Sequence, residues 1–288
     1  MENCNSYRER LIQIFYHTMQ LCNENTILIE AIKKSIDNQH IYWEEDDVLT
    51  DSAKTYDMPK IILSDKRTLQ AAKAYEGKKV CILNFASFIN PGGAVKKGTR
   101  TQEEGLCRIS TLYPAISDKE KGWPFYQKHR ELIERRELGW PNRDDCIYTP
   151  DVIVFKEDTS QCELMSTDDW YKVDVITCAA PDLRQARQRD LDNGSLSKRT
   201  LALKFMQRIK RILEIAIQHQ AEVIVLGAFG CGAFQNPPTI VSYAYNEVLK
   251  EYKKYFDTIE LAIYDRKEHH VIECFENIEN IEKNYINQ

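Results

Sequence analysis

Residues 84–93 read Asn-Phe-Ala-Ser-Phe-Ile-Asn-Pro-Gly-Gly, and residues 102–104 read Gln-Glu-Glu. The first stretch continues an apolar run at 80–83, which predicts a buried strand, and it leads into a glycine turn. A helix is then expected, with Glu103 and Glu104 in its first turn. A passage from strand through glycine loop into helix lets backbone N–H groups close on a phosphorylated ligand at the positive end of the helix dipole.

The two adjacent carboxylates allow two interpretations. Anion binding alone does not explain them, but they are explained if one donates a proton to a leaving group while the phosphate holds the substrate. Alternatively, Thr101 and Glu104 fit a capping box, in which Glu104 would reach back to the N–H of Thr101 at the helix start. A capping carboxylate has a lowered pKa, which does not suit a general acid. Local sequence leaves both interpretations open.

A second glycine loop follows another apolar run. Residues 227–237 read Gly-Ala-Phe-Gly-Cys-Gly-Ala-Phe-Gln-Asn-Pro, directly after the strand expected at 222–227. Its three glycines can each take a positive φ and let the chain wrap an anion with its N–H groups. The alternative is an ordinary tight connection from strand to helix. Two such loops on one sheet favour a ligand that contains a diphosphate.

Three side chains of this second loop each have two possible roles. Cys231 is the only cysteine in a glycine loop, but a thiol nucleophile needs a histidine partner, and the six histidines lie in no suggestive context. A small buried spacer is therefore the favoured interpretation of Cys231. Phe229 and Phe234 are either core residues, or one of them packs on a sugar.

Composition limits the remaining possibilities. The chain has 288 residues, 43% of them hydrophobic, which is enough for one large domain or for one domain with an added helical segment. The formal net charge of −5 argues against a general electrostatic hold on nucleic acid or on an anionic membrane. No apolar run approaches the roughly 20 residues of a membrane span, and the N-terminus lacks signal-peptide features. The nine scattered cysteines form no metal-binding pattern and indicate reduced thiols in a cytoplasm.

The order of elements along the chain predicts an α/β fold. Residues 6–36 are expected to be helical, residues 118–147 form a charged and aromatic insertion with a helix at 126–138, and the tail from 275 is expected to be a frayed helix. Strands alternating with helices indicate a sheet between two helix layers, with ligands beyond the carboxyl ends of the strands. The expected strands are 60–63, 79–85, 151–155, 173–177, 222–227 and 259–264, and further helices are expected at 68–75, around 202–216 and at 239–252.

Taken together, the stretches 83–93, 102–108 and 226–234 resemble the microbial-type poly(ADP-ribose) glycohydrolases, which are macrodomain proteins. The resemblance extends over about residues 55–265 and weakly into the N-terminal helices. It implies a three-layer α/β/α macrodomain with a mixed central sheet. The implied organisation is an N-terminal helical extension (1–50) packed on the core, a catalytic domain (51–275) that contains the 118–147 insertion, and a C-terminal tail (276–288).

The resemblance also implies a reaction, which is cleavage of ribose–ribose O-glycosidic bonds to release terminal ADP-ribose. Glu104 would protonate the departing ribose oxygen and then activate water, Glu103 would hydrogen-bond a ribose hydroxyl, and Gln102 would orient the pair. No metal or organic cofactor is implied. The partners would be poly(ADP-ribose) or an ADP-ribosylated protein, with ADP-ribose as product, and neither a membrane nor sequence-specific nucleic acid.

The substrate-binding residues follow from the same resemblance. The second loop would cradle the diphosphate, the first loop would hold the distal ribose, and Phe234 would pack on that ribose. The expected residues are Asn90, Gly92, Gly93, Ala94, Gln102, Gly227, Phe229, Gly230, Cys231, Gly232, Ala233 and Phe234.

One residue departs from the family pattern, in which three glycines are usual. Here the third is Ala94, whose methyl group could crowd the ribose or disfavour a positive φ by roughly 1 kcal/mol or more. Other readings remain: a hydrolase of mono-ADP-ribosyl groups or of O-acyl-ADP-ribose, and a non-catalytic reader of ADP-ribose. The presence of both glutamates favours an enzyme, because a reader gains nothing from carboxylates that face a diphosphate.

Overall fold

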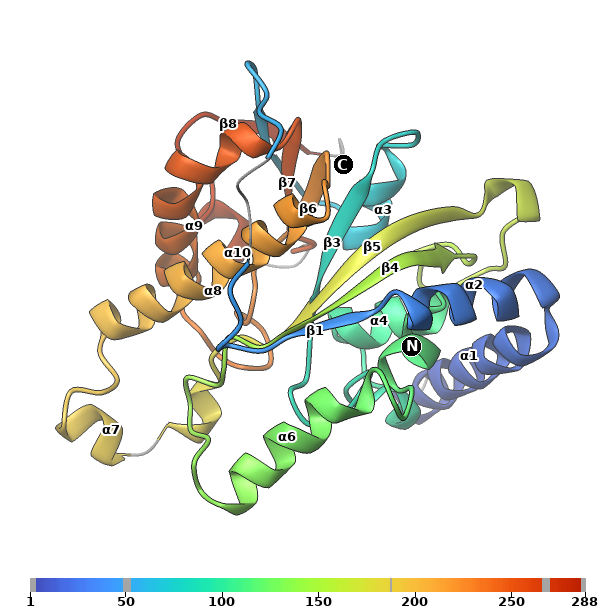
Figure 1. Ribbon diagram of the computed structural model, residues 1–288, viewed down its shortest axis with the longest axis horizontal. Helices are drawn as coiled ribbons and strands as arrows, with labels where there is room; N and C mark the ends of the chain where they lie inside the picture. Colours follow the sequence, from blue (N-terminus) through green and yellow to red (C-terminus); the bar gives the residue numbers. More distant parts are fainter. Residues whose placement is uncertain (1–3, 49–52, 187, 266–269, 286–288) are drawn as a thin grey trace.

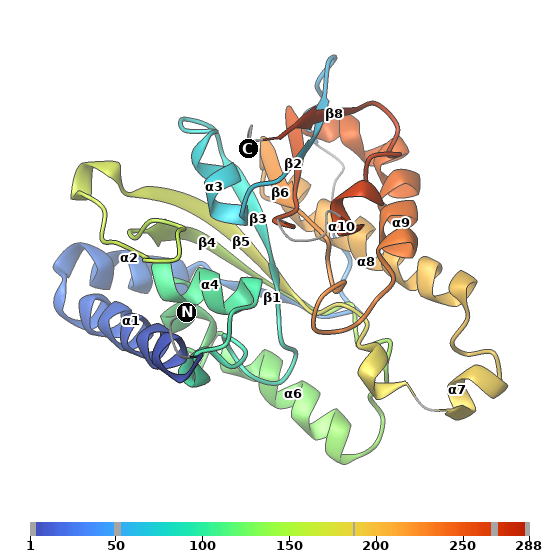
Figure 2. The ribbon, with the colours of Figure 1, turned by 180° about the vertical axis from the view of Figure 1, so that it is seen from behind.

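The middle layer of the molecule is a mixed sheet (Figures 1 and 2). The computed structural model describes residues 4–48, 53–186, 188–265 and 270–285. Within them the strand order is β1-β4-β5-β3-β6-β7-β2-β8, antiparallel from β1 to β5 and parallel elsewhere. The strands are β1 (His40–Tyr42), β2 (Lys60–Ser64), β3 (Val80–Phe85), β4 (Cys146–Val154), β5 (Tyr171–Cys178), β6 (Val223–Leu226), β7 (Thr258–Ala262) and β8 (Ile281–Asn284).

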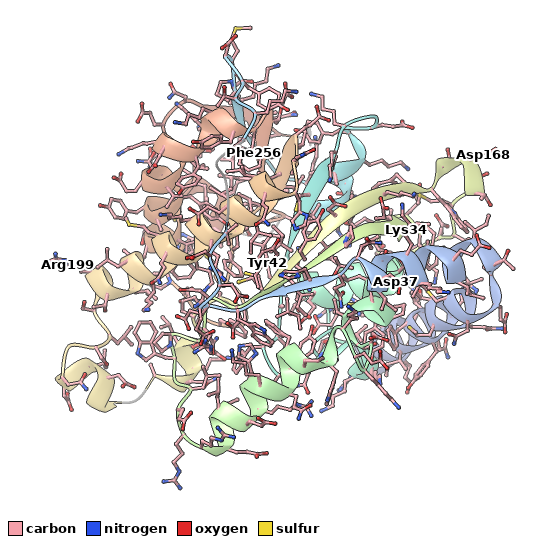
Figure 3. The ribbon with its side chains drawn as sticks, in the orientation of Figure 1. Lys34, Asp37, Tyr42, Asp168, Arg199 and Phe256 are labelled. Carbon is pink, nitrogen blue, oxygen red and sulfur yellow. The ribbon has the colours of Figure 1, made fainter. Side chains whose placement is uncertain are left out.

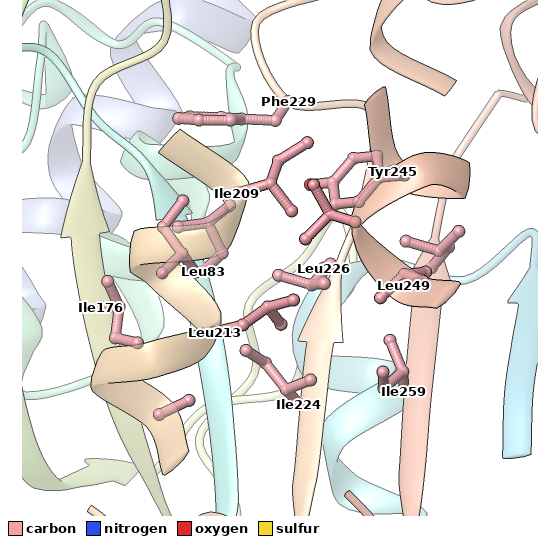
Figure 4. Packing of buried hydrophobic residues seen from close by; sticks show 14 of the residues in the cluster. Leu83, Ile176, Ile209, Leu213, Ile224, Leu226, Phe229, Tyr245, Leu249 and Ile259 are labelled. Atoms are coloured by element: carbon pink, nitrogen blue, oxygen red, sulfur yellow. The ribbon is translucent and has the colours of Figure 1, made fainter. Parts of the chain in front are cut away.

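Helices cover both faces of this sheet, as the side chains of β3 require. Cys81 and Leu83 pack into a core with α8 and α9, shown in Figure 4, whereas Val80 and Ile82 pack into a core beneath α1, α3 and α4. A strand buried on both faces is apolar throughout, and the three-layer α/β/α prediction is confirmed. The helices are α1 (Cys4–Glu24), α2 (Thr26–Asp37), α3 (Thr68–Lys73), α4 (Gln102–Ile109), α5 (Leu112–Ile116), α6 (Trp123–Glu134), α7 (Gln188–Asp192), α8 (Lys198–Gln218), α9 (Pro238–Tyr252) and α10 (His270–Glu273).

The N-terminal segment forms two helices rather than one continuous stretch. Asn25 ends the first and caps the second, because its side-chain oxygen accepts hydrogen bonds from the amides of Ile27 and Leu28. Lys34 of α2, labelled in Figure 3, donates to Asp151 of β4 at 2.6 Å, so the extension lies against the sheet. The boundary expected between residues 50 and 51 lies outside the described residues.

The predicted elements differ from the structure at the two edges of the sheet. The three-residue strand β1 was not predicted, and residues 281–284 form strand β8 beside β2, so the prediction of a frayed helix for the tail is wrong there. These edge strands are held by main-chain hydrogen bonds, and the side chains of β8 are largely exposed. They therefore lack the alternation that identifies a strand in a sequence. Residues 286–288 of the predicted tail lie outside the described residues.

The boundaries of the insertion also differ from the prediction. Helix α6 begins at Trp123 rather than at residue 126, because Pro124 occupies a first-turn position where its missing N–H costs nothing. The helix ends before Arg136, whose φ is +61°. Strand β4 begins at Cys146, inside the segment expected to be an insertion.

Lys156, which follows β4 in the chain, is hydrogen-bonded to helix α1. Its side chain is 1% exposed, and its Nζ donates to Thr18 Oγ1 at 2.7 Å and to the Ile14 carbonyl oxygen at 3.3 Å. Within the described part of the chain no carboxylate lies within ion-pair distance of it. Burial lowers the pKa of Lys156 to about 8, since an ammonium group loses hydration there.

This burial predicts a pH dependence of stability. Between about pH 8 and the ordinary lysine value of about 10.4, the unfolded chain binds the Lys156 proton more tightly than the folded protein does, so stability rises with pH. The melting temperature of wild type, relative to that of Lys156→Met, should therefore rise between about pH 7.5 and pH 10. Thermal unfolding followed by circular dichroism measures this difference. Lys33→Met, which removes an exposed lysine of α2, is the control, and a constant difference for Lys156→Met would contradict the assignment.

Candidate active site

The two glycine loops meet at one large cavity. They follow β3 and β6, which are adjacent parallel strands, so their carboxyl ends lie side by side at one edge of the sheet. The cavity has a volume of about 1320 Å³, and both loops, the first turn of α4 and part of α6 line it. A volume of this size accommodates a dinucleotide-like ligand.

The first loop brings its backbone against both carboxylates. Gly92 and Gly93 have φ values of +68° and +58°, and the Gly93 amide donates to the Asn90 carbonyl oxygen at 2.9 Å. A Cβ placed on Gly93 would lie 2.6 Å from Glu104 Oε1 and 2.9 Å from Glu103 Oε2. Only glycine therefore fits at position 93, for both its backbone conformation and its contacts.

Ala94 does not have the conformational cost expected from the sequence. Its φ is −110°, an ordinary value for a residue with a side chain, so the expectation of a disfavoured positive φ is wrong. The chain has already reversed its direction at Gly92 and Gly93, which take the positive φ values. The Ala94 amide instead has a direct role, because it donates to Glu104 Oε1 at 2.9 Å.

Glu104 is held by this turn and by Thr101. Thr101 is the N-cap residue of α4, but its hydroxyl donates to Glu104 Oε2 and makes no hydrogen bond to a backbone amide. The capping-box interpretation is therefore wrong. The carboxylate lies between the Thr101 hydroxyl and the glycine turn, and only 4% of the residue is exposed.

Glu103 is buried even more completely and is incompletely paired. Its Oε2 accepts a hydrogen bond from the Ser87 amide at 2.7 Å, whereas Oε1 is buried and has no partner among the described residues. Burial raises the pKa of Glu103 well above its usual range, and the neighbouring Glu104 raises it further. A neutral carboxyl group with one unoccupied oxygen beside a cavity can hydrogen-bond a hydroxyl of a ligand.

Gln102 joins the start of α4 to the end of β3. Its Oε1 accepts from the Phe85 amide at 2.9 Å, and its Nε2 donates to the Leu83 carbonyl oxygen at 2.7 Å and to Thr68 Oγ1 at 3.1 Å. These bonds fix the helix relative to the strand. The two following glutamates are fixed with it.

The second loop presents backbone donors to the cavity. The amides of Gly230, Gly232, Ala233 and Phe234 have no hydrogen-bond acceptor within the described part of the chain. Of the three glycines only Gly230 takes a positive φ, +75°, and Gly227 is required instead by close packing, since a Cβ there would lie 2.6 Å from the Ala262 carbonyl oxygen. Several free amides in one short loop are typical of an anion-binding concavity.

The side chains of this loop have different roles. Phe229 is completely buried, packs against Phe85 and Phe205 and lies in the core of Figure 4, so its ring cannot cover a sugar. Phe234 is partly exposed at the cavity, with the Arg184 guanidinium 4.8 Å from its ring centroid. Burial raises the pKa of Cys231 to about 12, which argues against a thiolate nucleophile.

Arg130 of the insertion is a site residue that the sequence did not reveal. Its Nε donates to the Ile89 carbonyl oxygen and its Nη2 to Asn90 Oδ1, both at 2.8 Å, while Trp123 packs 4.7 Å from the guanidinium. Helix α6 therefore holds Asn90 in position. The only signal was the spacing of Trp123 and Arg130, two helical turns apart on one face.

Among the described residues no cluster of three or more His, Cys, Asp or Glu side chains could hold a metal ion. None of the described helices combines the length and apolar character required to cross a membrane.

The family follows from comparison with known proteins. A sequence model of the family described as "Microbial-type PARG, catalytic domain" matches residues 10–157, just over half of the chain. The chain belongs to this family. PARG denotes poly(ADP-ribose) glycohydrolase, so the protein is a glycosidase that acts on poly(ADP-ribose). The family predicted from the two glycine loops and the Gln-Glu-Glu stretch is confirmed.

Solved structures of bacterial glycohydrolases are similar to the whole fold. The enzyme of Thermomonospora curvata has a TM-score of 0.79 and 24% identity, and its complex with the inhibitor ADP-HPD has 0.78 and 25%; each comparison covers 92% of this chain and 97% of that chain. The enzyme of Deinococcus radiodurans in complex with ADP-ribose has a TM-score of 0.71 and 25% identity, covering 85% of this chain and 94% of that chain. No curated protein matched.

The contacts of Gly93 predict a strong effect of adding one methyl group. Gly93→Ala combines a strained backbone with displacement of both carboxylates, so activity on poly(ADP-ribose) should fall on the order of 10²-fold. Gly139→Ala is the matched control, because a Cβ there makes only an ordinary contact of 3.7 Å outside the cavity. Steady-state rates of ADP-ribose release test this, and equal activity of the two variants would contradict the geometry.

The raised pKa of Glu103 predicts how stability depends on pH. The folded protein binds this proton more tightly than the unfolded chain, so stability falls as pH rises above the unfolded value of about 4.3. Glu103→Gln keeps an oxygen for the Ser87 amide and does not titrate. The melting temperature of this variant should exceed that of wild type by a margin that grows from about pH 5 to pH 8. Each kcal/mol gained in the free energy of unfolding should raise it by about 2–4 °C. The exposed Glu120→Gln is the control, and a difference independent of pH would refute the prediction.

Proposed function

We propose that Glu104 is the general acid and base that releases terminal ADP-ribose from poly(ADP-ribose), with Glu103 hydrogen-bonded to a ribose hydroxyl. The observation that carries this proposal is the placement of both buried carboxylates against the backbone of Gly93, in the same cavity as the free amides of the second loop. This arrangement puts a proton donor next to an anion-binding concavity in one cavity.

The terminal ADP-ribose unit would lie along the edge of the sheet. The free amides of Gly230, Gly232, Ala233 and Phe234 would bind its diphosphate, and Phe234 would pack on the distal ribose. Residues 90–93 would hold that ribose, with Asn90 positioned by Arg130. The Deinococcus radiodurans enzyme, solved with ADP-ribose, supports this choice of ligand for a similar fold.

The hydrogen bonds of Glu104 suit a residue that gains and loses a proton. Thr101 Oγ1 can donate to the carboxylate or accept from the protonated acid, because a hydroxyl does both. In the first step the bond from the distal ribose C1 to the bridging oxygen breaks, and the Glu104 proton passes to that oxygen. The oxocarbenium-like ribose is stabilised by the nearby diphosphate. Water then adds to C1 and returns a proton to Glu104.

We further infer a cytoplasmic location from the cysteines. Eight cysteines among the described residues are free thiols, five of them buried, which is expected in a reducing compartment. The negative net charge is consistent with a partner bound through local groups rather than through a broad basic face.

The test of the acid is Glu104→Gln compared with Glu103→Gln. The amide at position 104 keeps the size of the side chain and an acceptor for the Ala94 amide, but it has no proton to transfer. We expect kcat for ADP-ribose release to fall about 10²–10⁴-fold, with ADP-ribose binding by calorimetry retained. If kcat fell further in Glu103→Gln than in Glu104→Gln, Glu103 rather than Glu104 would be assigned as the acid. If wild type bound ADP-ribose without releasing it from the polymer, a mono-ADP-ribosyl substrate or a reader function would replace the proposal.

A further inference from the structure

A cluster of cations borders the cavity on the side of Glu104. We call it the basic rim and define it as Arg8, Lys96, Lys97 and Arg100. Lys96, Lys97 and Arg100 line the cavity, and all four residues are exposed. Arg8 joins α1 to this loop, since its Nε donates to the Lys97 carbonyl oxygen at 2.6 Å. The rim is therefore built from two segments that are distant in sequence.

The cations of the rim are not neutralised by acidic partners. Across the described residues, no ion pair joins a rim cation to a carboxylate. Aromatic rings take that place: the Lys96 Nζ lies 5.5 Å from the centroid of Tyr113, and the Arg100 guanidinium lies 5.3 Å from that of Tyr7. A local group of uncompensated cations in a chain of net charge −5 indicates an anionic ligand rather than solubility.

The loop that carries most of the rim leads directly into the helix of Glu104. The same loop that carries the cations also holds the acid, through the Ala94 amide and the Thr101 hydroxyl. The acid must contact the departing oxygen, and the second loop would already hold the terminal diphosphate. Glu104, Lys96, Lys97 and Arg100 line one cavity, so a leaving unit that passed along residues 94–101 would meet the rim. In poly(ADP-ribose) that unit carries its own diphosphate one ribose away from the departing oxygen.

We propose that the basic rim binds the diphosphate of the leaving ADP-ribose unit, so that the enzyme holds two consecutive units of the polymer. This inference rests on the proposed function, because it takes Glu104 to face the bond that is cut. Charged side chains suit this position because the leaving unit must depart after cleavage. Exposed cations bind phosphate rapidly and reversibly, with a strong dependence on salt.

The test compares two substrates that differ in the leaving group. One is a two-unit fragment of poly(ADP-ribose), and the other is an aryl glycoside of ADP-ribose, whose phenolic leaving group has no phosphate. The rim variant is Lys96→Ala/Lys97→Ala/Arg100→Ala in the full chain. The matched control is Lys253→Ala/Lys254→Ala, which removes two adjacent lysines away from the cavity.

The rim variant should lose on the order of tenfold or more in kcat/KM on the two-unit fragment at low salt, and its salt dependence should become shallower. Its kcat/KM on the aryl glycoside and its affinity for ADP-ribose should match wild type, as should all values for the control. Equal losses on both substrates, or no loss on either, would overturn the proposal. Equal losses on both substrates would mean that the rim contributes to binding of the terminal unit or to folding. No loss on either substrate would mean that the rim has no role in hydrolysis.

Binding separates this inference from failure of the proposed function. In a Glu104→Gln background the two-unit fragment should bind more tightly than ADP-ribose, and the rim substitutions should abolish that difference. If wild type hydrolysed neither substrate, the proposed function would be wrong. The comparison of affinities alone would then show whether the rim binds a second ADP-ribose unit. Equal affinity for the fragment with and without the rim substitutions would then refute it.

Discussion

The site depends on the burial of two adjacent carboxyl groups against one glycine. Removing a carboxylate from water is costly unless it is hydrogen-bonded or protonated. Glu104 has two donors, whereas Glu103 has one hydrogen bond and a raised pKa. The absence of a side chain at Gly93 makes the approach possible, since its ideal Cβ would lie within 3 Å of both groups. The remaining features of the site keep this arrangement in place.

Two supports act from opposite sides. Gln102 bonds to the main chain at the end of β3 and fixes the start of α4, so the glutamates are held relative to the sheet. Arg130 fixes residues 89 and 90 from helix α6, so the glycine turn is held relative to the insertion. Each support includes a hydrogen bond between a side chain and a main-chain atom, which constrains position more closely than a contact between two flexible side chains. Catalysis by position requires such preorganisation.

Residue type was sufficient to predict the centre of the sheet and the two glycine loops, but not the edges of the sheet. The strands at the centre of the sheet are apolar on both faces, and the two glycine loops directly follow them, so both could be recognised from residue type. Strands β1 and β8 could not, because edge pairing depends on the neighbouring strand rather than on their own side chains. The direction of the Glu104 side chain was also beyond the sequence: Thr101 and Glu104 fit a capping box equally well, and only the folded turn provides the Ala94 amide. The φ of Ala94 was likewise set by the two glycines before it.

The distribution of charge around the cavity has a consequence for the chemistry. A cation in contact with Glu103 or Glu104 would favour the ionised carboxylate and deprive the acid of its proton. Among the described residues no lysine, arginine or histidine forms an ion pair with either group, and the free donors of the second loop are neutral amides. Neutral amides can hold a diphosphate without withdrawing the proton from a nearby carboxyl group. Cations line the cavity at the basic rim and also at Arg184, which lies beside Phe234 and is paired with Asp182. These groups can attract an anionic polymer, while their exposed position and solvent screening limit their effect on the acid. Neutral donors at the second loop and exposed, screened cations around the cavity thus allow a highly charged substrate to bind beside two buried carboxyl groups.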